Sequence, residues 1–543
     1  MFGSVVTMAA VATLTFASPT AAQLEAESML EDRIRQRLEA AFESNSLEVI
    51  GERLHADQLL QRAYSARGFK PLWVTLGGVQ PAGENFARWL GEQPNNHGLP
   101  AADYHLLAVE QLHGAVDAGS LVDLELALSD AFFMLGSHFL AGRLNPESLD
   151  PEWRANRRHR DLAPLINRAA TLPQPGDALL DLLPQSAGYE QLIRRLAELR
   201  SVQTHGGWPA MPEGRTLREG DDDMRVIELG ERLRSSGDFN GEPSALFDSE
   251  LAAAVSRFQS RHGLGADGIV GQATLRALNV PVERRIDQII VNLERWRWLP
   301  ENLGVRYVLV NIAGFTLDVI DQDTTTLSMR VVVGQPYRRT PVFSSSISYL
   351  VFNPFWEVPI SIAVKDKLPL IKSDPGLLAK QGYTLLEGWG ASETIVDPLT
   401  VNWATITAKN FRFRLRQSPG PHNALGRVKF MFPNEFSVYL HDTPSRELFS
   451  RDSRPFSSGC IRLERPLELA ELLLAGNPAW DRAAIDRAIG TRKEKTVRLP
   501  QAVPVHLLYW TAWVDTDNAL QFRDDIYFRD TNVLRLLRVT PPD

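Results

Sequence analysis

The chain has 543 residues, which is too long for a single hydrophobic core and predicts three or four domains. It carries 58 Lys and Arg against 66 Asp and Glu, and this net charge of −8, without a dominant basic stripe, argues against nucleic acid as the main partner. Hydrophobic residues make up 44% of the chain, as expected for a soluble globular protein.

The first segment has features of an export signal. Residues 5–16 are apolar, and the small residues Thr20-Ala-Ala22 offer a signal peptidase its cleavage site. Residues 1–22 are therefore predicted to be a signal peptide. It departs from the usual pattern in lacking a positive n-region, because no Lys or Arg precedes Arg33. No later stretch reaches the ~18 apolar residues of a membrane span, so we expect a mature chain in the periplasm without a transmembrane segment.

Residues 23–215 have the pattern of a helical domain. Apolar residues recur every four positions between charges from Leu30 to Phe42, as on one face of an amphipathic helix. Residues 124–140 are almost continuously apolar and predict the central helix of a bundle. No acid pair or metal-ligand spacing stands out here, so we interpret the region as a helical scaffold domain.

Residues 222–282 predict a compact unit of three helices, the last of which ends at Leu278. The pair Phe258-Gln259, followed by Asp267-Gly-Ile-Val-Gly271, resembles the small peptidoglycan-binding module attached to many wall hydrolases. On the residues alone the unit is a three-helix bundle with an Asp-Gly turn, so the wall ligand is what the resemblance implies. His262, in the loop between two helices, is expected on the surface.

The hydrophobic period changes from 3.6 to 2 near residue 300, after an amphipathic helix over 286–299. Residues 300–495 are therefore predicted to form a mostly-β domain. Its first strands are expected at 307–310, 316–320, 329–333 and 346–352.

Two further segments accompany this β domain. The alternation is lost over about 363–415, and such a long insertion is typical of a functional lid, so we expect a capping subdomain there. Residues 496–543 carry a hairpin signal, Val505–Val514 paired with Leu520–Phe522, which is expected to pack on the edge of the domain.

Cys460 is the only cysteine of the chain. In an oxidising compartment a lone cysteine is a candidate reactive thiol, although a small buried hydrophobe is the alternative. It follows Ser457-Ser458-Gly459, small residues that permit a sharp turn with backbone N–H groups free to face a ligand. His441 follows the apolar run 436–440, which predicts a buried strand. A thiol and an imidazole in these settings suit cysteine acyl transfer, with Cys460 as nucleophile and His441 as base.

His441, a variable segment and then Ser457-Ser-Gly-Cys-Ile-Arg462 resemble the catalytic signature of L,D-transpeptidases, the YkuD-type domain. The common form has His before the Gly, where this chain has Ser458. When Asn423-Ala-Leu-Gly426 and Asn292-Leu-Glu-Arg-Trp296 are added, the chain resembles the large periplasmic subgroup of this family. That subgroup implies a multidomain α+β protein: a helical scaffold domain, a small three-helix wall-binding module and a mostly-β catalytic domain with an inserted capping subdomain.

The resemblance also implies a reaction. A wall tetrapeptide stem is cut before its terminal D-Ala through a thioester on Cys460, and the acyl group passes to an amine of another stem, giving a 3→3 crosslink without a cofactor. Backbone N–H groups of Ser458, Gly459 and Cys460 are expected to stabilise the oxyanion, at ~3 kcal/mol per donor. The backbone carbonyl of Asp442 is expected to orient His441, because the adjacent side chain on a strand points to the opposite face. A His⁺ neighbour is expected to lower the pKa of the thiol.

Three more residues are candidates for the substrate groove. Arg462 is expected to pair with a substrate carboxylate, with a structural ion pair as the alternative. Trp356 and Tyr439 are candidates to line the groove, with a place in the core as the alternative.

His422 is the rival base, but a Gly/Pro loop supports it less rigidly than a strand end supports His441. No metal site is expected, because the histidines lack ligand spacing.

Other functions remain compatible with the sequence. An L,D-carboxypeptidase, or a transferase that anchors a protein to the wall, would use the same thiol chemistry with a different acceptor. A non-catalytic peptidoglycan-binding scaffold would make Cys460 incidental and predicts that Cys460→Ala keeps all activity. The sequence gives no indication of the oligomeric state.

Overall fold

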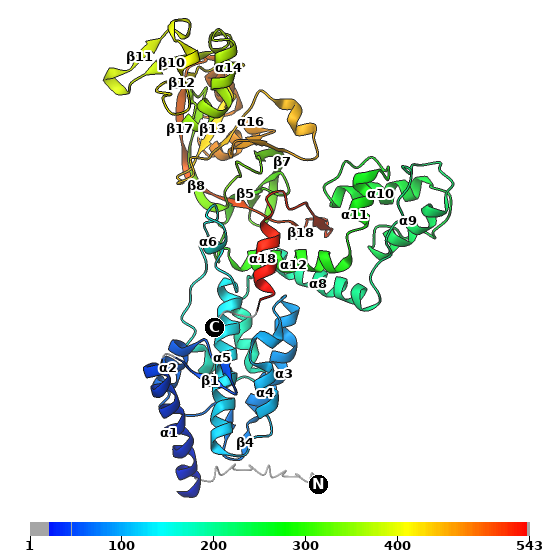
Figure 1. The fold of residues 1–543 in the computed structure, drawn as a ribbon, viewed down its shortest axis with the longest axis vertical. Helices are drawn as coiled ribbons and strands as arrows, with labels where there is room; N and C mark the ends of the chain where they lie inside the picture. The colour runs from blue at the N-terminus through cyan, green and yellow to red at the C-terminus, as the bar shows by residue number, and fades with distance from the viewer. Residues whose placement is uncertain (1–20, 45, 540–543) are drawn as a thin grey trace, which may run out of the picture.

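The computed structural model describes residues 21–44 and 46–539, so the expected signal peptide falls almost wholly outside the described residues. The molecule is elongated, with scaffold helices at one end, a mostly-β domain above them, a capping unit at the far end and a three-helix module at the side (Figure 1). This is the multidomain α+β architecture predicted from the sequence. In the described part, no helix has the length and apolar character needed to cross a bilayer.

The N-terminal domain is a helical bundle around α5. Its helices are α1 (Ala21–Ser44), α2 (Asp57–Ala66), α3 (Pro81–Asn96), α4 (Leu106–Leu112), α5 (Ala118–Ala141), α6 (Pro146–Leu149), α7 (Leu165–Ala169) and α8 (Ala187–Thr204). Short elements join them: β1 (Glu48–Val49), β2 (Glu52–Arg53), β3 (Val74–Thr75), β4 (Gly78–Val79), η1 (Ala101–Asp103) and η2 (Pro175–Leu182). The apolar run of α5 is buried on nearly all sides, and its fully buried Glu125 accepts hydrogen bonds from the N–H groups of Leu72, Trp73 and Val74. This carboxylate therefore ties a loop to the central helix, because a buried charge needs such partners.

The module at the side consists of α9 (Met224–Ser235), α10 (Ser249–Arg261) and α11 (Gln272–Leu278) around its own core. Its sequence signature has a structural basis: Gln259 donates to Asp267 Oδ1 at 2.8 Å and accepts from Gly268 N–H at 2.9 Å. His262 is buried rather than on the surface, because its ring stacks on Phe258 and on Phe522 of the β domain, with centroids 3.9 and 5.6 Å away. The module is thus docked against the β domain through this ring.

Helix α12 (Val282–Arg297) joins the scaffold to the β domain. Toward the scaffold, its buried Arg297 pairs with Glu294 at 2.8 Å and donates to the carbonyl of His97. Toward the β domain, Arg295 lies 2.7 Å from Asp530, at the start of α18 (Arg529–Leu537). These ion pairs join the helix to both neighbours and help to fix their orientation on it.

The β domain is built on a nine-stranded sheet in the order β15-β7-β16-β14-β13-β8-β17-β5-β6, which closes on itself because β6 also pairs with β7. The strands are β5 (Arg306–Asn311), β6 (Thr316–Asp321), β7 (Thr324–Gly334), β8 (Phe343–Phe352), β13 (Val428–Met431), β14 (Leu440–His441), β15 (Pro455–Ser457), β16 (Ile461–Leu463) and β17 (Lys495–Leu508). Around them lie η7 (Arg446–Ser450), α16 (Pro466–Leu474) and α17 (Arg482–Gly490).

The C-terminal part of the chain differs from the expectation of a peripheral hairpin. β17 lies inside the sheet, antiparallel to β8 and parallel to β5, with Val505 opposite Val308. The expected hairpin is shorter, with β18 (Ala512–Val514) paired to β19 (Leu520–Phe522). The apolar run from Val505 is therefore divided between a central strand and a hairpin, and α18 follows.

The insertion forms a capping unit with a separate core between β9 and β12. Its sheet contains β9 (Trp356–Glu357), β10 (Tyr383–Glu387), β11 (Thr394–Val396) and β12 (Arg414–Gln417). Its helical turns are α13 (Ile360–Ile362), η3 (Ala363–Lys367), α14 (Leu368–Ser373), α15 (Leu377–Lys380), η4 (Gly390–Ser392), η5 (Pro398–Thr400) and η6 (Trp403–Thr405). This cap begins a few residues before, and ends just after, the range expected from the sequence.

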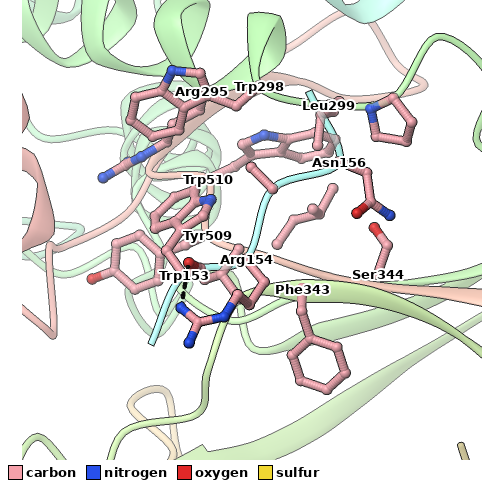
Figure 2. A pocket seen from close by; sticks show the side chains of 14 residues that line it. Trp153, Arg154, Asn156, Arg295, Trp298, Leu299, Phe343, Ser344, Tyr509 and Trp510 are labelled. Carbon is pink, nitrogen blue, oxygen red and sulfur yellow. Dashed lines mark hydrogen bonds between the residues drawn. The ribbon is translucent and has the colours of Figure 1, made fainter. Parts of the chain in front are cut away.

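An extended segment after α6, residues 150–154, runs from the scaffold along the β domain; we call it the strap. Strap and sheet exchange two backbone hydrogen bonds of 2.8 Å, from Arg154 N–H to Val342 O and from Val342 N–H to Glu152 O. Trp153 fits edge-to-face against Trp298 of the α12 end, 5.1 Å between ring centroids, in a pocket also lined by Tyr509 (Figure 2). The scaffold therefore contacts the β domain through a strand-like segment as well as through α12.

Candidate active site

Cys460 lies at the end of a tight turn between β15 and β16. Gly459 has φ +115°, a conformation that an L side chain rarely adopts, so the turn requires glycine here. The Ser457 hydroxyl closes the turn by donating to the Cys460 carbonyl at 2.5 Å and accepting from Gly459 N–H at 3.1 Å. The Gly459 N–H is thereby occupied, which leaves the Ser458 and Cys460 N–H groups of this turn for a ligand.

His441 lies at the end of β14, on the strand next to β16. The two strands are parallel, with Leu440 opposite Ile461 and His441 opposite Arg462. The strand is shorter than the sequence predicts, because Ser437 has φ +56° and interrupts the extended run. His441 and Cys460 line one cleft of about 920 Å³.

The imidazole is held by the main chain. Nδ1 of His441 lies 2.5 Å from the carbonyl oxygen of Asp442, the contact that the resemblance implies. The Asp442 carboxylate points elsewhere: Oδ2 accepts from Arg427 N–H at 2.9 Å and from Arg427 Nε at 2.7 Å. Asp442 can therefore set the tautomer of His441 through its carbonyl, which would leave Nε2 as the basic nitrogen.

The thiol and imidazole are both neutral near pH 7. Burial, and to a smaller extent the nearby charge of Arg462, lower the pKa of His441 to about 3. Burial raises the pKa of Cys460 to about 11, against a smaller opposing effect of hydrogen bonding to Tyr439 and of Arg462. The expected thiolate–imidazolium pair is therefore not favoured, because burial disfavours both charges. A neutral imidazole remains able to accept the thiol proton as the sulfur attacks.

The other predicted groove residues also line this cleft: Ser458, Gly459, Arg462, Trp356 and Tyr439. Among the described residues, no hydrogen bond or ion pair engages the Arg462 side chain, and its Nε is buried without a partner. The Tyr439 ring lies 5.7 Å from the His441 ring, and burial raises the pKa of its hydroxyl. The exposed His422 is not among the lining residues. A half-buried guanidinium without an ion pair is suited to bind a carboxylate.

Sequence reasoning missed Arg338, which lies in the loop after β7. Its Nη1 donates to Ser458 Oγ at 2.9 Å, and its two terminal nitrogens pair with Asp366 of the cap at 2.5 and 2.8 Å. Arg338 thus contacts both the cysteine turn and the cap. In this loop Gly334, Pro336 and Pro341 indicate a break in the strand pattern, but no local pattern indicates which residues Arg338 contacts.

Among the residues that the structure describes, no group of three or more His, Cys, Asp or Glu side chains could hold a metal ion.

Comparison with family models matches three separate segments of the chain. Residues 305–480 match the model described as "L,D-transpeptidase catalytic domain", which contains both Cys460 and His441. Residues 58–196 match "Scaffold domain", and residues 223–278 match "Putative peptidoglycan binding domain".

A curated relative is the "Putative L,D-transpeptidase" of Haemophilus influenzae, 36% identical over 247 residues. The alignment covers 45% of this chain and 48% of the relative, so the chain spans about half the length of the curated relative that it matches.

Solved structures were also matched, at low similarity. The L,D-transpeptidase from Xylanimonas cellulosilytica (residues 123–326) is 14% identical, with TM-score 0.17, covering 55% of this chain and 99% of that one. The L,D-transpeptidase from Stackebrandtia nassauensis is 14% identical, with TM-score 0.21, covering 55% and 96%. These TM-scores are below 0.5, so the two structures carry no argument about this chain, and its three domains are identified by the family models alone.

Proposed function

Because the chain carries an L,D-transpeptidase catalytic domain with a scaffold domain and a peptidoglycan-binding domain, we propose that it is a peptidoglycan L,D-transpeptidase of the bacterial periplasm that forms 3→3 crosslinks. The observation that carries the proposal is one cleft in which Cys460, His441 and the unpartnered Arg462 lie together. A nucleophile, a base and an anion-binding group in one cleft are the parts that acyl transfer from a peptide requires.

In the first half-reaction, Sγ of Cys460 bonds to the carbonyl carbon of the third stem residue while Nε2 of His441 takes the thiol proton. The tetrahedral oxyanion accepts hydrogen bonds from the N–H groups of Cys460 and Ser458. The C–N bond to the terminal D-Ala then breaks, and the imidazolium returns the proton to the leaving amine. The products are a thioester and free D-Ala.

In the second half-reaction, a side-chain amine of another stem attacks the thioester carbonyl and gives a proton to His441. The C–S bond breaks, and the sulfur regains a proton from the imidazolium. Arg462 binds a carboxylate of the stem, and Trp356 and Tyr439 line its path through the cleft. The cap covers the thioester and excludes water, which favours the amine over hydrolysis.

The side module is assigned to hold the enzyme on the wall. It is docked on the β domain through His262 and through Arg523, whose Nη1 donates to the carbonyl of Arg261 at 3.0 Å. A module fixed in this way would bring the cleft to the substrate at a defined distance and raise the local concentration of stems.

The test is the intact mass of the protein after mixing with a disaccharide-tetrapeptide. We expect a gain equal to the donor minus D-Ala in the wild type and no gain in Cys460→Ala. Identical behaviour of the two proteins would overturn the proposal and favour a non-catalytic binding role. Product analysis with an added stem amine then separates crosslinking from carboxypeptidase activity. Crosslinking joins the donor stem to the amine, whereas a carboxypeptidase gives only a tripeptide stem and D-Ala.

A further inference from the structure

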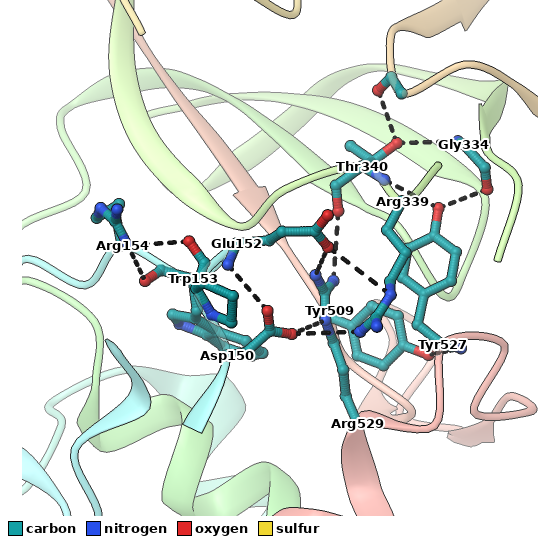
Figure 3. Close-up of polar contacts among 12 residues, drawn as sticks. Asp150, Glu152, Trp153, Arg154, Gly334, Arg339, Thr340, Tyr509, Tyr527 and Arg529 are labelled. Carbon is teal, nitrogen blue, oxygen red and sulfur yellow. Dashed lines mark hydrogen bonds and ion pairs between the residues drawn. The ribbon is translucent and has the colours of Figure 1, made fainter. Parts of the chain in front are cut away.

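A buried threonine contacts the cysteine turn from behind. Thr340, fully buried in the loop after β7, donates its hydroxyl to the Gly459 carbonyl at 2.8 Å. The same Oγ1 accepts from Gly334 N–H at 2.9 Å (Figure 3), so its donor is directed at Gly459. Thr340 is not among the residues that line the cleft and has no place in the reaction derived above.

This hydrogen bond sets the orientation of a peptide group next to the thiol. The Gly459 carbonyl and the Cys460 N–H belong to one planar trans peptide and point in opposite directions. Fixing the carbonyl therefore fixes the direction of the Cys460 N–H. Gly459 N–H already donates to the Ser457 hydroxyl, whereas Cys460 N–H meets no acceptor among the described residues.

The Thr340 backbone is itself held from two sides. Its N–H donates to the Tyr527 hydroxyl at 3.2 Å, and that hydroxyl donates to the Gly334 carbonyl at 2.6 Å. Its carbonyl accepts from Arg529 Nη1 at 3.3 Å. Arg529 pairs in turn with Asp150 of the strap at 2.7 Å, so the scaffold and the C-terminal segment both support this loop (Figure 3).

We propose that Thr340 is a positioning residue for the acylation step: by holding the Gly459 carbonyl, it directs the Cys460 N–H at the oxyanion. This inference depends on the function proposed above. An oxyanion donor works only when it is aimed in advance at the place where charge develops, so its support matters for the transition state more than for substrate binding.

The test is Thr340→Val, which keeps the shape and removes the hydroxyl. We expect acylation by the disaccharide-tetrapeptide to slow by about 10- to 100-fold, less than the ~10²–10³-fold of removing an oxyanion donor outright, with kcat lowered and KM unchanged. Alkylation of Cys460 by iodoacetamide forms no oxyanion, so its rate should stay within about twofold of wild type. Thr340→Ser, which retains the donor, should recover most of the acylation rate.

A matched control is Thr326→Val, because that hydroxyl also donates to a main-chain carbonyl of the sheet, Val319 O at 3.1 Å, away from the cleft. It should leave both rates unchanged. If Thr340→Val does not fold, Tyr527→Phe removes the hydroxyl that holds the Thr340 N–H and should slow acylation several-fold with unchanged alkylation.

The outcomes separate the two proposals. A wild type that forms no acyl-enzyme overturns the proposed function. A wild type that acylates, with Thr340→Val acylating at the same rate, overturns the positioning role alone. Equal losses in acylation and alkylation would also overturn it, since they would indicate a general disturbance of the thiol.

Discussion

The two walls of the cleft are built in different ways. The wall with Cys460 belongs to the closed sheet and is supported from behind by Thr340, Tyr527 and Arg529, each at most 4% exposed. The wall formed by the cap has a small core of its own and reaches across to Arg338 through Asp366, whose side chain is 42% exposed. One wall is anchored by buried polar contacts, and the other is joined across the cleft by an ion pair in contact with water.

This difference assigns different tasks to the two walls. Breaking a buried, fully paired network costs ~3–5 kcal/mol, whereas an exposed ion pair contributes ~0–1 kcal/mol. The reacting atoms are therefore held on the wall that resists displacement. The cap can separate from the cysteine turn at small cost, as a wall that must admit a peptide requires.

The largest effect is expected for the anchored wall at His441. His441→Gln removes the base and should slow acylation by ~10²–10⁴-fold, measured by intact mass over time. The matched control is His422→Gln, which should keep the wild-type rate because His422 is exposed and outside the cleft lining. Equal losses in both variants would contradict the assignment of His441.

The anchoring itself is tested by Arg529→Met. This change removes the shorter ion pairs of Asp150 and Glu152 and leaves these carboxylates only the longer contacts with Arg339, at 3.7 and 3.8 Å. It should lower the free energy of unfolding of the β domain by ~1–3 kcal/mol, measured by urea titration. Arg482→Met, which breaks an exposed pair with Asp486 in the same domain, should cost at most ~1 kcal/mol. If both variants lowered the free energy of unfolding by the same amount, the buried contacts behind Cys460 would be no stronger than an exposed ion pair, which would contradict the contrast between the two walls.

The pH dependence of thiol alkylation tests the charge state of the site. Burial raises the pKa of Cys460 to about 11, so the iodoacetamide rate should keep rising well above pH 9 instead of levelling near the ~8.5 of a free thiol. Arg462→Gln removes a positive charge that stabilises the thiolate, so the midpoint should move to still higher pH. Arg465→Gln, at an exposed pair with Glu468, should leave it unchanged. A downward shift in Arg462→Gln would contradict this electrostatic picture.

The smallest effect on stability is expected at the cap. Asp366→Asn removes the ion pair with Arg338 and should change the free energy of unfolding by less than ~1 kcal/mol. The thioester should, however, hydrolyse a few-fold faster, because the cap covers it less completely. Asp374→Asn breaks an exposed pair with Lys380 inside the cap and serves as the control, with an unchanged lifetime of the thioester. Equal lifetimes in both variants would mean that the ion pair does not hold the cap closed.

The sequence was most informative where structure is local. The apolar run of α5 and the amphipathic helix α12 follow from periodicity, and the turn that ends at Cys460 follows from its small residues and its glycine. These features depend on neighbours within a few positions, which a pattern records directly.

It was least informative where contacts join distant segments. Thr340 meets Gly459 across 119 positions, and Arg529 meets Asp150 across 379, so no local pattern contains either contact. The lowered pKa of His441 was missed for the same reason, because burial and the charge of Arg462 both come from the assembled sheet. Ser437 ended a predicted strand through its positive φ, which its residue type does not signal.

The central place of β17 has a consequence for how the protein folds. Residues 495–508 fill the gap between β8 and β5, and the parallel pairing with β5 joins positions 197 apart, as from Val308 to Val505. Until that strand is in place, β5 and β8 present open edges that invite pairing with other chains. Such long-range closure is slow, so the folding chain is exposed to aggregation and acquires its closed sheet only after residues 495–508 have paired.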